Sequence, residues 1–381
     1  MRVFLNFLTN WPPLQPLSAE VRQYRMAAFS ALVAMVLTTS LRPEDPPEIE
    51  VQPTVIEREI EFNGQSMEFG GEPLRLVGTL TLPTHYDAPH PAVLLISGAA
   101  GPAGRSPLAE DLNGMMTEIA HHLANKGFAS FRYEHRSALR YDDQMPFPAS
   151  DLSKASSAWD FSRHREDAGA AYDVLRKQAE VRTDLRPLIL GHHFGGTLAL
   201  SVTPTRRPAG LILLSTPGRP VRESLVRQYT AWVQVSGYPE EERAIILANL
   251  KPTLQALEER NDGLADSHRF WTGIFTRTTV GFYHGIFRAR PIQAAASFKG
   301  PLLVAQGERD TLVDPEADAA ELAMFFNRLR PDSTTLWVIP GVDHYFRGRA
   351  NGGTGGDSGP MHPALFQGID NYLDQHFPRE N

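Results

Sequence analysis

Three features are missing from this sequence of 381 residues: cysteine, a basic cluster and a long apolar run. The absence of cysteine excludes disulfides, thiolate nucleophiles and cysteine-ligated metal sites. With 37 Lys and Arg against 44 Asp and Glu, the formal net charge is -7, and no basic cluster recurs on a helical face. Nucleic-acid binding requires a positive surface, so we exclude nucleic acid as a partner.

No apolar run is long enough to span a bilayer. The best candidate, residues 26–37, follows two arginines and precedes Thr38 and Ser40. A basic flank, a short apolar core and small residues, in that order, are typical of a cleavable export signal. We therefore expect residues 1–40 to be a signal segment and the protein to be periplasmic or secreted. The alternative is an N-terminal helix of a cytoplasmic protein.

The sequence has the composition of an ordinary globular protein, with 42% hydrophobic and 21% charged residues. Residues 41–57 are rich in proline and acidic side chains, which predicts a linker ahead of the folded body. Residues 58–64 and 74–83 alternate apolar and polar side chains, which predicts an antiparallel hairpin. We therefore expect folded structure to begin near Arg58.

Six short apolar runs follow the hairpin. They are AVLLI (92–96), FASFRY (128–133), LILG (188–191), LILL (211–214), LLVA (302–305) and LWVI (336–339). Continuous apolarity predicts strands buried on both faces, as in a parallel sheet. Helical patterns lie between most of the runs, so the sequence predicts an α/β fold with a doubly wound, mostly parallel sheet and antiparallel leading strands.

One of the predicted helices, residues 315–329, has an apolar stripe that we expect to face the sheet. The stripe consists of Leu322, Phe325, Phe326 and Leu329. Residues 217–298 break the alternation of strands and helices, because they are helical in character and too long for a simple connection. They predict a helical insertion over the sheet, which divides the core into residues 58–216 and 299–381.

A glycine-rich stretch, residues 347–360, predicts a flexible surface loop. It lacks the lysine and the strand-to-helix context of a phosphate-binding loop. No other pattern indicates a cofactor, and none is expected.

The most informative stretch is LILGHHFGGTLAL, residues 188–200. Gly191, His193 and Gly195 form G-x-H-x-G at a predicted turn from strand to helix, and Gly196 follows. A sharp turn of this kind raises its central side chain above the sheet on a strained backbone, and glycines let strand and helix approach closely. The pattern therefore predicts a nucleophile elbow with His193 at its apex.

Two further polar residues follow later strands. Asp310 comes after the run 302–305, in QGERD, and His344 comes after the run 336–339, in PGVDHYF. An elbow residue, an acid and a histidine thus occur in this order, each in a loop at a strand end. The same order is found in the catalytic triads of α/β-hydrolases.

On these residues the chain resembles bacterial α/β-hydrolases of the serine-esterase and prolyl-oligopeptidase-like group. The resemblance covers roughly residues 58–378. It rests on the stretches LLISGAAGP, GFASFRYEHRS, GHHFGG, QGERD and PGVDHYF. Two stretches depart from the family pattern: His193 stands where serine is usual, and residues 134–137 replace the usual Asp-x-Arg-Gly.

The resemblance implies roles for several residues. Asp310 would orient a catalytic His344, and the backbone amides of Phe194 and Ala99 would form an oxyanion hole. Residues 217–298 would form a cap over the site. Its aromatic residues suggest an apolar or aromatic group on the substrate, although such residues also serve as core. They are Trp232, Phe270, Trp271, Phe275, Phe282 and Tyr283.

Other residues compete for some of these roles. Asp314 is an alternative acid but lies further past its strand, and Asp343 fits a loop residue better. His192 fits a structural histidine. Ser97 and Ser215 end strands near the predicted pocket, and either would be a displaced nucleophile, although neither lies on an elbow.

A histidine at the elbow permits several chemistries. Neutral imidazole is a nucleophile and an acyl-imidazole reacts with water, so His193 can support acyl transfer with His344 as base. We expect hydrolysis of small-molecule, ester-like acyl substrates. The alternatives are a non-hydrolytic acid/base enzyme that uses His193 and His344, and an inactive binding module. A metal site built from these two histidines and Asp310 is a further alternative.

Overall fold

The computed structural model describes residues 55–65, 71–98, 114–136, 160–259, 269–275, 279–348 and 360–378. All of them belong to one unit of the chain, residues 53–381. The predicted signal segment, residues 1–40, lies outside the described residues. The first strand begins at Val55, so the predicted linker ends sooner than expected. Residues 55–57 join the strand because the end of its neighbour, up to Pro83, pairs with them.

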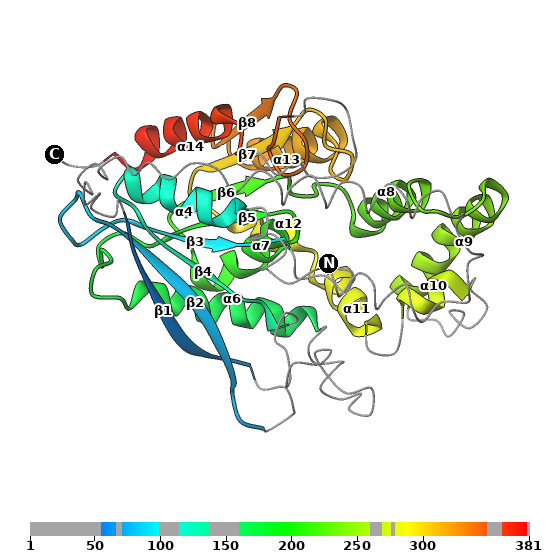
Figure 1. Cartoon of the computed structure of the whole chain (residues 1–381), viewed down its shortest axis with the longest axis horizontal. Coiled ribbons are helices and arrows are strands. Elements are labelled where there is room, and N and C mark those ends of the chain that lie inside the picture. Colours follow the sequence, from blue (N-terminus) through cyan, green and yellow to red (C-terminus); the bar gives the residue numbers. More distant parts are fainter. Residues whose placement is uncertain are drawn as a thin grey trace, which may run out of the picture. The chain divides into compact units, whose positions relative to one another are not determined.

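An eight-stranded sheet forms the centre of the described structure, in the order β1-β2-β4-β3-β5-β6-β7-β8 (Figure 1). The strands are β1 (Val55–Gly64), β2 (Leu74–Pro83), β3 (Ala92–Ile96), β4 (Ala129–Tyr133), β5 (Leu188–His192), β6 (Leu211–Leu214), β7 (Leu302–Gly307) and β8 (Thr334–Ile339). The pairs β1–β2 and β2–β4 are antiparallel, and every other pair is parallel. The predicted fold class is confirmed.

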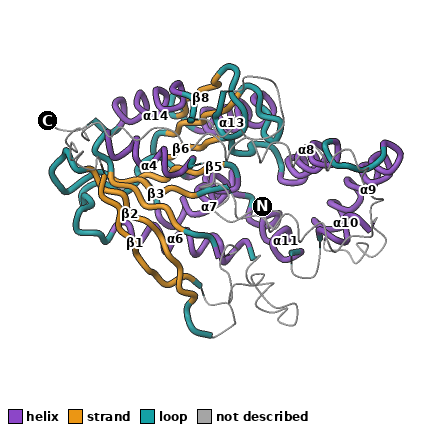
Figure 2. Tube along the Cα trace, in the orientation of Figure 1, coloured by secondary structure: helices purple, strands orange, loops and turns teal. Residues whose placement is uncertain are grey.

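Helices cover both faces of this sheet (Figure 2). Residues of α4 (Met115–Asn125) and α14 (Pro363–His376) pack in one apolar core. Residues of α6 (Phe161–Arg176), α7 (Phe194–Arg206) and α13 (Glu321–Leu329) pack in the other. Successive side chains of a strand enter opposite cores, which explains why the central strands β3 and β6 are apolar at every position. No helix among the described residues is long and apolar enough to cross a membrane.

Two local predictions are wrong. Strand β8 lies at the edge of the sheet and is not buried on both faces, since Leu336 and Val338 are 36% and 39% exposed. Residues 315–329 begin as a π-helix, η4 (Pro315–Ala320), and continue as α13. Leu329 does not complete the predicted apolar stripe: it is the last residue of α13 and is 53% exposed.

Helices occupy the predicted insertion between β6 and β7. They are α8 (Val221–Gln234), α9 (Glu240–Glu259), α10 (Arg269–Ile274), α11 (Val280–Ala289) and α12 (Pro291–Ala294), followed by the short η3 (Ala295–Ser297). Trp271, Phe275, Phe282 and Tyr283 are buried, and the Tyr229 and Tyr283 hydroxyls are 2.5 Å apart. These aromatic residues belong to the same apolar core as residues of α6 and α7. Of the predicted substrate-contacting aromatics, Trp232 is the one with a largely exposed side chain.

Candidate active site

The turn between β5 and α7 has the geometry of a nucleophile elbow. Strand β5 ends at His192 and α7 begins at Phe194, so His193 alone connects them. His193 has φ 51° and ψ -113°, a strained conformation for a residue with a side chain. Its amide donates to the Leu214 carbonyl on the neighbouring strand, at 2.9 Å. The backbone thus holds the imidazole at the apex of the turn.

Three glycines allow the elbow to form. A Cβ atom on Gly191 would collide with the Gly195 backbone, because strand and helix meet there. One on Gly195 would collide with the Ile96 carbonyl at the end of β3, and one on Gly196 with the Thr216 side chain. Each position therefore requires glycine for close approach of strand and helix, as predicted.

The loop after β7 holds Asp310 in a saturated hydrogen-bond environment. Its Oδ1 accepts from the amides of Leu312 and Val313, at 2.8 and 2.9 Å. Its Oδ2 accepts from Gln306 Nε2 at 2.9 Å and lies 2.7 Å from His344 Nδ1. A carboxylate only accepts, so Nδ1 donates this hydrogen bond, and in the neutral ring the electron pair is on Nε2. The predicted hydrogen bond between Asp310 and His344 is present.

The two competing acids have other partners. Asp314 caps η4 by accepting from two amides that follow it, and it pairs with Arg227 at 2.9 Å. Asp343 accepts from the amides of Tyr345 and Arg347 within its own loop. Asp310 is the carboxylate that lies 2.7 Å from His344 Nδ1. The geometry therefore favours Asp310 as the acid.

Three histidines meet above the sheet. The rings of His193 and His344 have centroids 4.8 Å apart and cross at 79°. The His192 ring is also 4.8 Å from that of His344, and its Nε2 donates to the His344 carbonyl at 3.0 Å. The Ser215 hydroxyl donates to the same carbonyl at 3.2 Å. His192 and Ser215 therefore hold the backbone of the His344 loop, which is the structural role predicted for His192.

The electrostatics differ between the elbow and the acid. Burial, and then the neighbouring His344 and His192, hold the pKa of His193 well below its ordinary value of 6.5. Asp310 acts in the opposite direction but is the smallest influence. Burial raises the pKa of Asp310, but the interactions with His344 and the other donors outweigh it and leave that pKa lowered. At neutral pH the elbow is therefore a neutral imidazole and the acid is an anion.

The predicted oxyanion hole is described only in part. Phe194 is the first residue of α7, and the first amides of a helix lack intrahelical acceptors, so its N–H is available to a ligand oxygen. Ala99 lies outside the described residues. Ser97 is buried at the end of β3, and no described residue forms a hydrogen bond with its hydroxyl. Within the described part of the chain no group of three metal-ligating side chains has the geometry to hold an ion.

Several residues that support the site were not predicted. Gln306, the one amide in the otherwise apolar β7, donates both to Asp310 and to the Val313 carbonyl, at 3.1 Å. A lone amide at the end of a buried strand was a usable signal. His135 Nε2 donates to the Ser97 carbonyl at 3.2 Å, beside the predicted oxyanion loop. Nothing in its sequence spacing indicated this contact.

The departing turn at residues 134–137 is only partly a departure. Arg136 is buried and pairs with Asp167 of α6, at 2.6 Å from Nε and 2.7 Å from Nη2. Arg136 also donates to the Gln65 carbonyl at 2.9 Å, which ties the hairpin to this ion pair. Arg136 therefore stands at the arginine position of the usual Asp-x-Arg-Gly, and its role is structural: it connects α6 to the hairpin.

The comparison with known families agrees with this geometry. The family model described as serine aminopeptidase, S33, matches residues 108–347, which is more than half of the chain. The chain belongs to this family. The S33 match includes the elbow, Asp310 and His344, and the resemblance to the α/β-hydrolase superfamily is confirmed.

Individual relatives are more distant. The chain is 24% identical over 237 residues to esterase EstD of Thermotoga maritima. The aligned region covers 62% of this chain and 50% of EstD. It thus spans about half the length of this curated relative. Est1E of Butyrivibrio proteoclasticus, in its ferulic acid complex, has a TM-score of 0.50 and 12% identity, covering 80% and 96% of the two chains.

The esterase Pf2001 of Pyrococcus furiosus also has a TM-score of 0.50, with 13% identity and coverage of 84% of this chain and 90% of that one. At these identities the two solved structures show a shared fold and nothing further.

Proposed function

We propose that the protein hydrolyses small-molecule, ester-like acyl substrates, with His193 as the nucleophile and the Asp310–His344 pair as the base. One observation carries the proposal: an elbow with a strained φ of 51° presents a neutral imidazole 4.8 Å from the ring of a histidine that is bonded to a buried carboxylate. The similarity to an enzyme named esterase EstD supports an ester as the substrate.

The acylation half-reaction begins when the electron pair on a His193 ring nitrogen adds to the ester carbonyl carbon. The Phe194 amide stabilises the resulting oxyanion. Collapse of this intermediate breaks the bond to the alcohol oxygen and leaves His193 acylated. The proton from the other His193 nitrogen is transferred through His344 to the departing alcohol, so the products are an acyl-imidazole and a neutral alcohol.

Deacylation uses the Asp310–His344 pair. His344 Nε2 removes a proton from water as the water oxygen attacks the acyl carbon, and Asp310 stabilises the imidazolium that forms. The bond between the acyl carbon and His193 then breaks, and His344 returns the proton to His193. The acid product leaves and both histidines recover their initial protonation.

A panel of p-nitrophenyl esters tests this function. We expect the protein to hydrolyse them and the His193→Ala variant to lose activity by about a thousandfold or more, because covalent catalysis is removed. His121→Ala is a matched control, since His121 lies on α4 and pairs with Glu57 at 3.1 Å. Undiminished hydrolysis by His193→Ala would refute the role of His193 and direct attention to a displaced serine or a binding function.

Mass spectrometry separates the covalent route from direct water attack with His193 as base. The protein quenched during turnover of p-nitrophenyl acetate should carry one acetyl group on the peptide that contains His193. Recovery of only unmodified peptide, with hydrolysis intact, would contradict the nucleophilic role.

We also propose that the protein is exported, on the strength of the signal-like residues 26–40. Mass spectrometry of the protein from its native host should show that the segment has been removed. An intact segment in the cytosolic fraction would refute export.

A further inference from the structure

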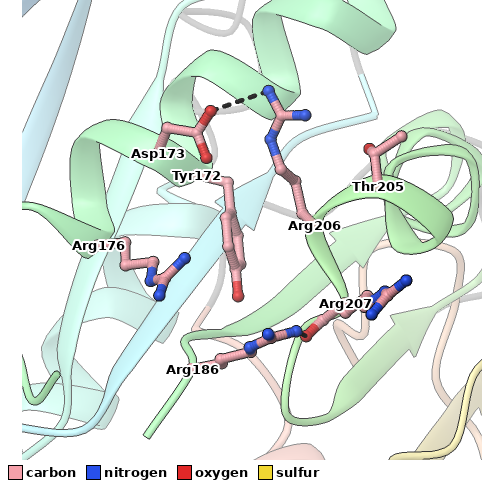
Figure 3. Close-up of a pocket in the computed structure, with 7 residues that line it drawn as sticks. All are labelled: Tyr172, Asp173, Arg176, Arg186, Thr205, Arg206 and Arg207. Carbon is pink, nitrogen blue, oxygen red and sulfur yellow. Dashed lines mark hydrogen bonds and ion pairs between the residues drawn. The ribbon is translucent and has the colours of Figure 1, made fainter. Parts of the chain in front are cut away.

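A hollow lies at the opposite end of β5 from the elbow. It has a volume of about 380 Å³ and is shown in Figure 3. Its lining consists of Tyr172, Asp173, Arg176, Arg186, Thr205, Arg206 and Arg207. These residues come from the ends of α6 and α7 and from the loop before β5. We call this hollow the arginine pocket.

The arginine pocket concentrates positive charge in a chain whose net charge is -7. Its lining carries four arginines against a single carboxylate, that of Asp173. Arg206 already forms an ion pair with this carboxylate, with Nη2 at 2.9 Å from Oδ2. Among the described residues, Arg186 makes one hydrogen bond, to the Arg207 carbonyl at 3.2 Å. Within the described part of the chain no ion pair engages Arg176, so the pocket has an excess of donors and no matching anion.

The walls of the pocket are fixed in place. Arg206 also donates to the Gly169 carbonyl at 3.3 Å, and a Cβ on Gly169 would lie 2.9 Å from Arg206 Nη2. Because Gly169 has no side chain, the Arg206 guanidinium can lie against α6 at this point. The buried Tyr172 donates its hydroxyl to the Pro187 carbonyl at 3.0 Å, and Figure 3 shows Arg176 beside its ring. Burial raises the pKa of Tyr172, so it adds no negative charge.

The helix dipole accounts for the positions of two of the four arginines in the pocket. Arg176 and Arg206 lie in the last turns of α6 and α7, where a cation interacts favourably with the helix dipole. Arg186 lies on a loop. Arg207 has a φ of 49°, in the left-handed region where glycine is less costly. Arg290 has the same conformation after α11, with a φ of 43°, so Arg186 and Arg207 are the two arginines of the pocket whose positions the helix dipole does not explain.

We propose that the arginine pocket binds a small organic phosphate, with its phosphate group held by Arg176 and Arg186. Guanidinium groups bind phosphate oxygens in pairs through parallel N–H donors, and both side chains are exposed to solvent and accessible. A volume of about 380 Å³ is within the size range of small-molecule sites and leaves room for the organic part. This site is separate from the elbow and does not depend on the proposed hydrolysis.

Isothermal titration calorimetry with sodium pyrophosphate tests the site on the full chain. We expect saturable binding of one pyrophosphate, and binding weakened about tenfold or more in the double variant Arg176→Gln, Arg186→Gln. The matched control is Arg165→Gln, because Arg165 is also on α6 but pairs with Glu166 at 2.8 Å and does not line the pocket. Thermal unfolding of each variant verifies that it remains folded.

Three outcomes would overturn the proposal. One is the absence of saturable pyrophosphate binding at low ionic strength. Another is an equal loss of binding in Arg165→Gln, which would indicate non-specific attraction to the surface. The third is binding to phosphatidylglycerol vesicles without binding to soluble pyrophosphate, which would assign the arginines to a lipid surface.

Discussion

The elbow and the loop after β7 differ in how far their polar side chains are satisfied by hydrogen bonds. In the loop, Asp310 receives four hydrogen bonds, from two amides, Gln306 and His344. At the elbow, Nδ1 of His193 is buried and no described residue bonds to it. Buried polar atoms are normally satisfied, and an exception calls for a functional explanation. The Asp310 carboxylate is therefore saturated before substrate arrives, whereas the His193 ring keeps an unsatisfied nitrogen.

This difference changes how the two halves of the proposed reaction depend on the Asp310–His344 pair. A serine hydroxyl needs a base before it can attack, but a neutral imidazole already has a free electron pair. Because burial holds the pKa of His193 low, that electron pair is available at neutral pH. The pair should therefore matter more for the attack of water than for the first attack on the ester.

The most direct way to break the comparison is to give the elbow a serine. We expect His193→Ser to react with a fluorophosphonate probe, whereas the natural chain does not label at the elbow because it lacks the hydroxyl. The effect should be all or none on the peptide containing residue 193. The control is the double variant His193→Ser, Asp310→Asn, which should label far more slowly. A labelled elbow in the natural chain, or an unlabelled His193→Ser, would contradict the assignment.

Removing the charge of the acid gives the next largest effect. Asp310→Asn should lower steady-state ester turnover by about 10³ to 10⁴, since the amide can no longer stabilise the His344 imidazolium. An initial burst of p-nitrophenolate, one per chain, should survive, because this leaving group departs as an anion and does not need the proton that His344 carries to an ordinary alcohol. Asp314→Asn is the matched control, because that carboxylate pairs with Arg227. Equal losses in burst and turnover would show that both halves depend on Asp310.

The sequence predicted the sharp turn at His193 and the hydrogen bond between Asp310 and His344, because each depends on local pattern. Gly191, Gly195 and Gly196 each permit a close approach at one turn, and Asp310 and His344 follow apolar runs at parallel strand ends. It failed where burial depends on distant neighbours. Leu336 is exposed because β8 has a neighbouring strand on one side only, which no pattern within the strand reveals.

Support for the site was harder to predict for the same reason. The contact of His135 with the Ser97 carbonyl joins residues 38 apart, and that of His192 with the His344 carbonyl joins residues 152 apart. Such contacts are set by strand order in the sheet. A single sequence with short local motifs carries no record of that order at these positions.

His193 and Asp310 should affect the free energy of unfolding over different pH ranges. A histidine with a lowered pKa in the folded state stays neutral while the unfolded chain takes up a proton, so stability falls as pH decreases below 6.5. Urea unfolding between pH 7 and pH 5 should therefore show a larger loss for the natural chain than for His193→Ser. Asp310 affects stability at lower pH, because a carboxylate with a lowered pKa loses its stabilising effect only as the pH falls below its ordinary pKa of 3.8. Identical losses in the two proteins would contradict a lowered pKa of His193 in the folded state.

The smallest effect that we expect concerns the connection between the acid loop and the helical insertion. Arg227 on α8 pairs with Asp314 at 2.9 Å, and its Nη2 donates to the Asp310 carbonyl at 3.4 Å. The ion pair is partly exposed and the second bond is long, so together they contribute about 1 kcal/mol at most. Arg227→Gln should lower the kcat for ester hydrolysis a few-fold with little change in KM, because it loosens the acid and not the substrate contacts.

Arg222→Gln is the control for that change, since it removes a comparable exposed pair, with Glu258 at 3.3 Å, from the same helix. Arg227→Lys retains the charge and should recover part of the kcat. If Arg222→Gln lowers kcat as much as Arg227→Gln does, the effect comes from α8 as a whole. If neither variant changes kcat, the acid loop holds Asp310 without help from the insertion, and its own four hydrogen bonds suffice.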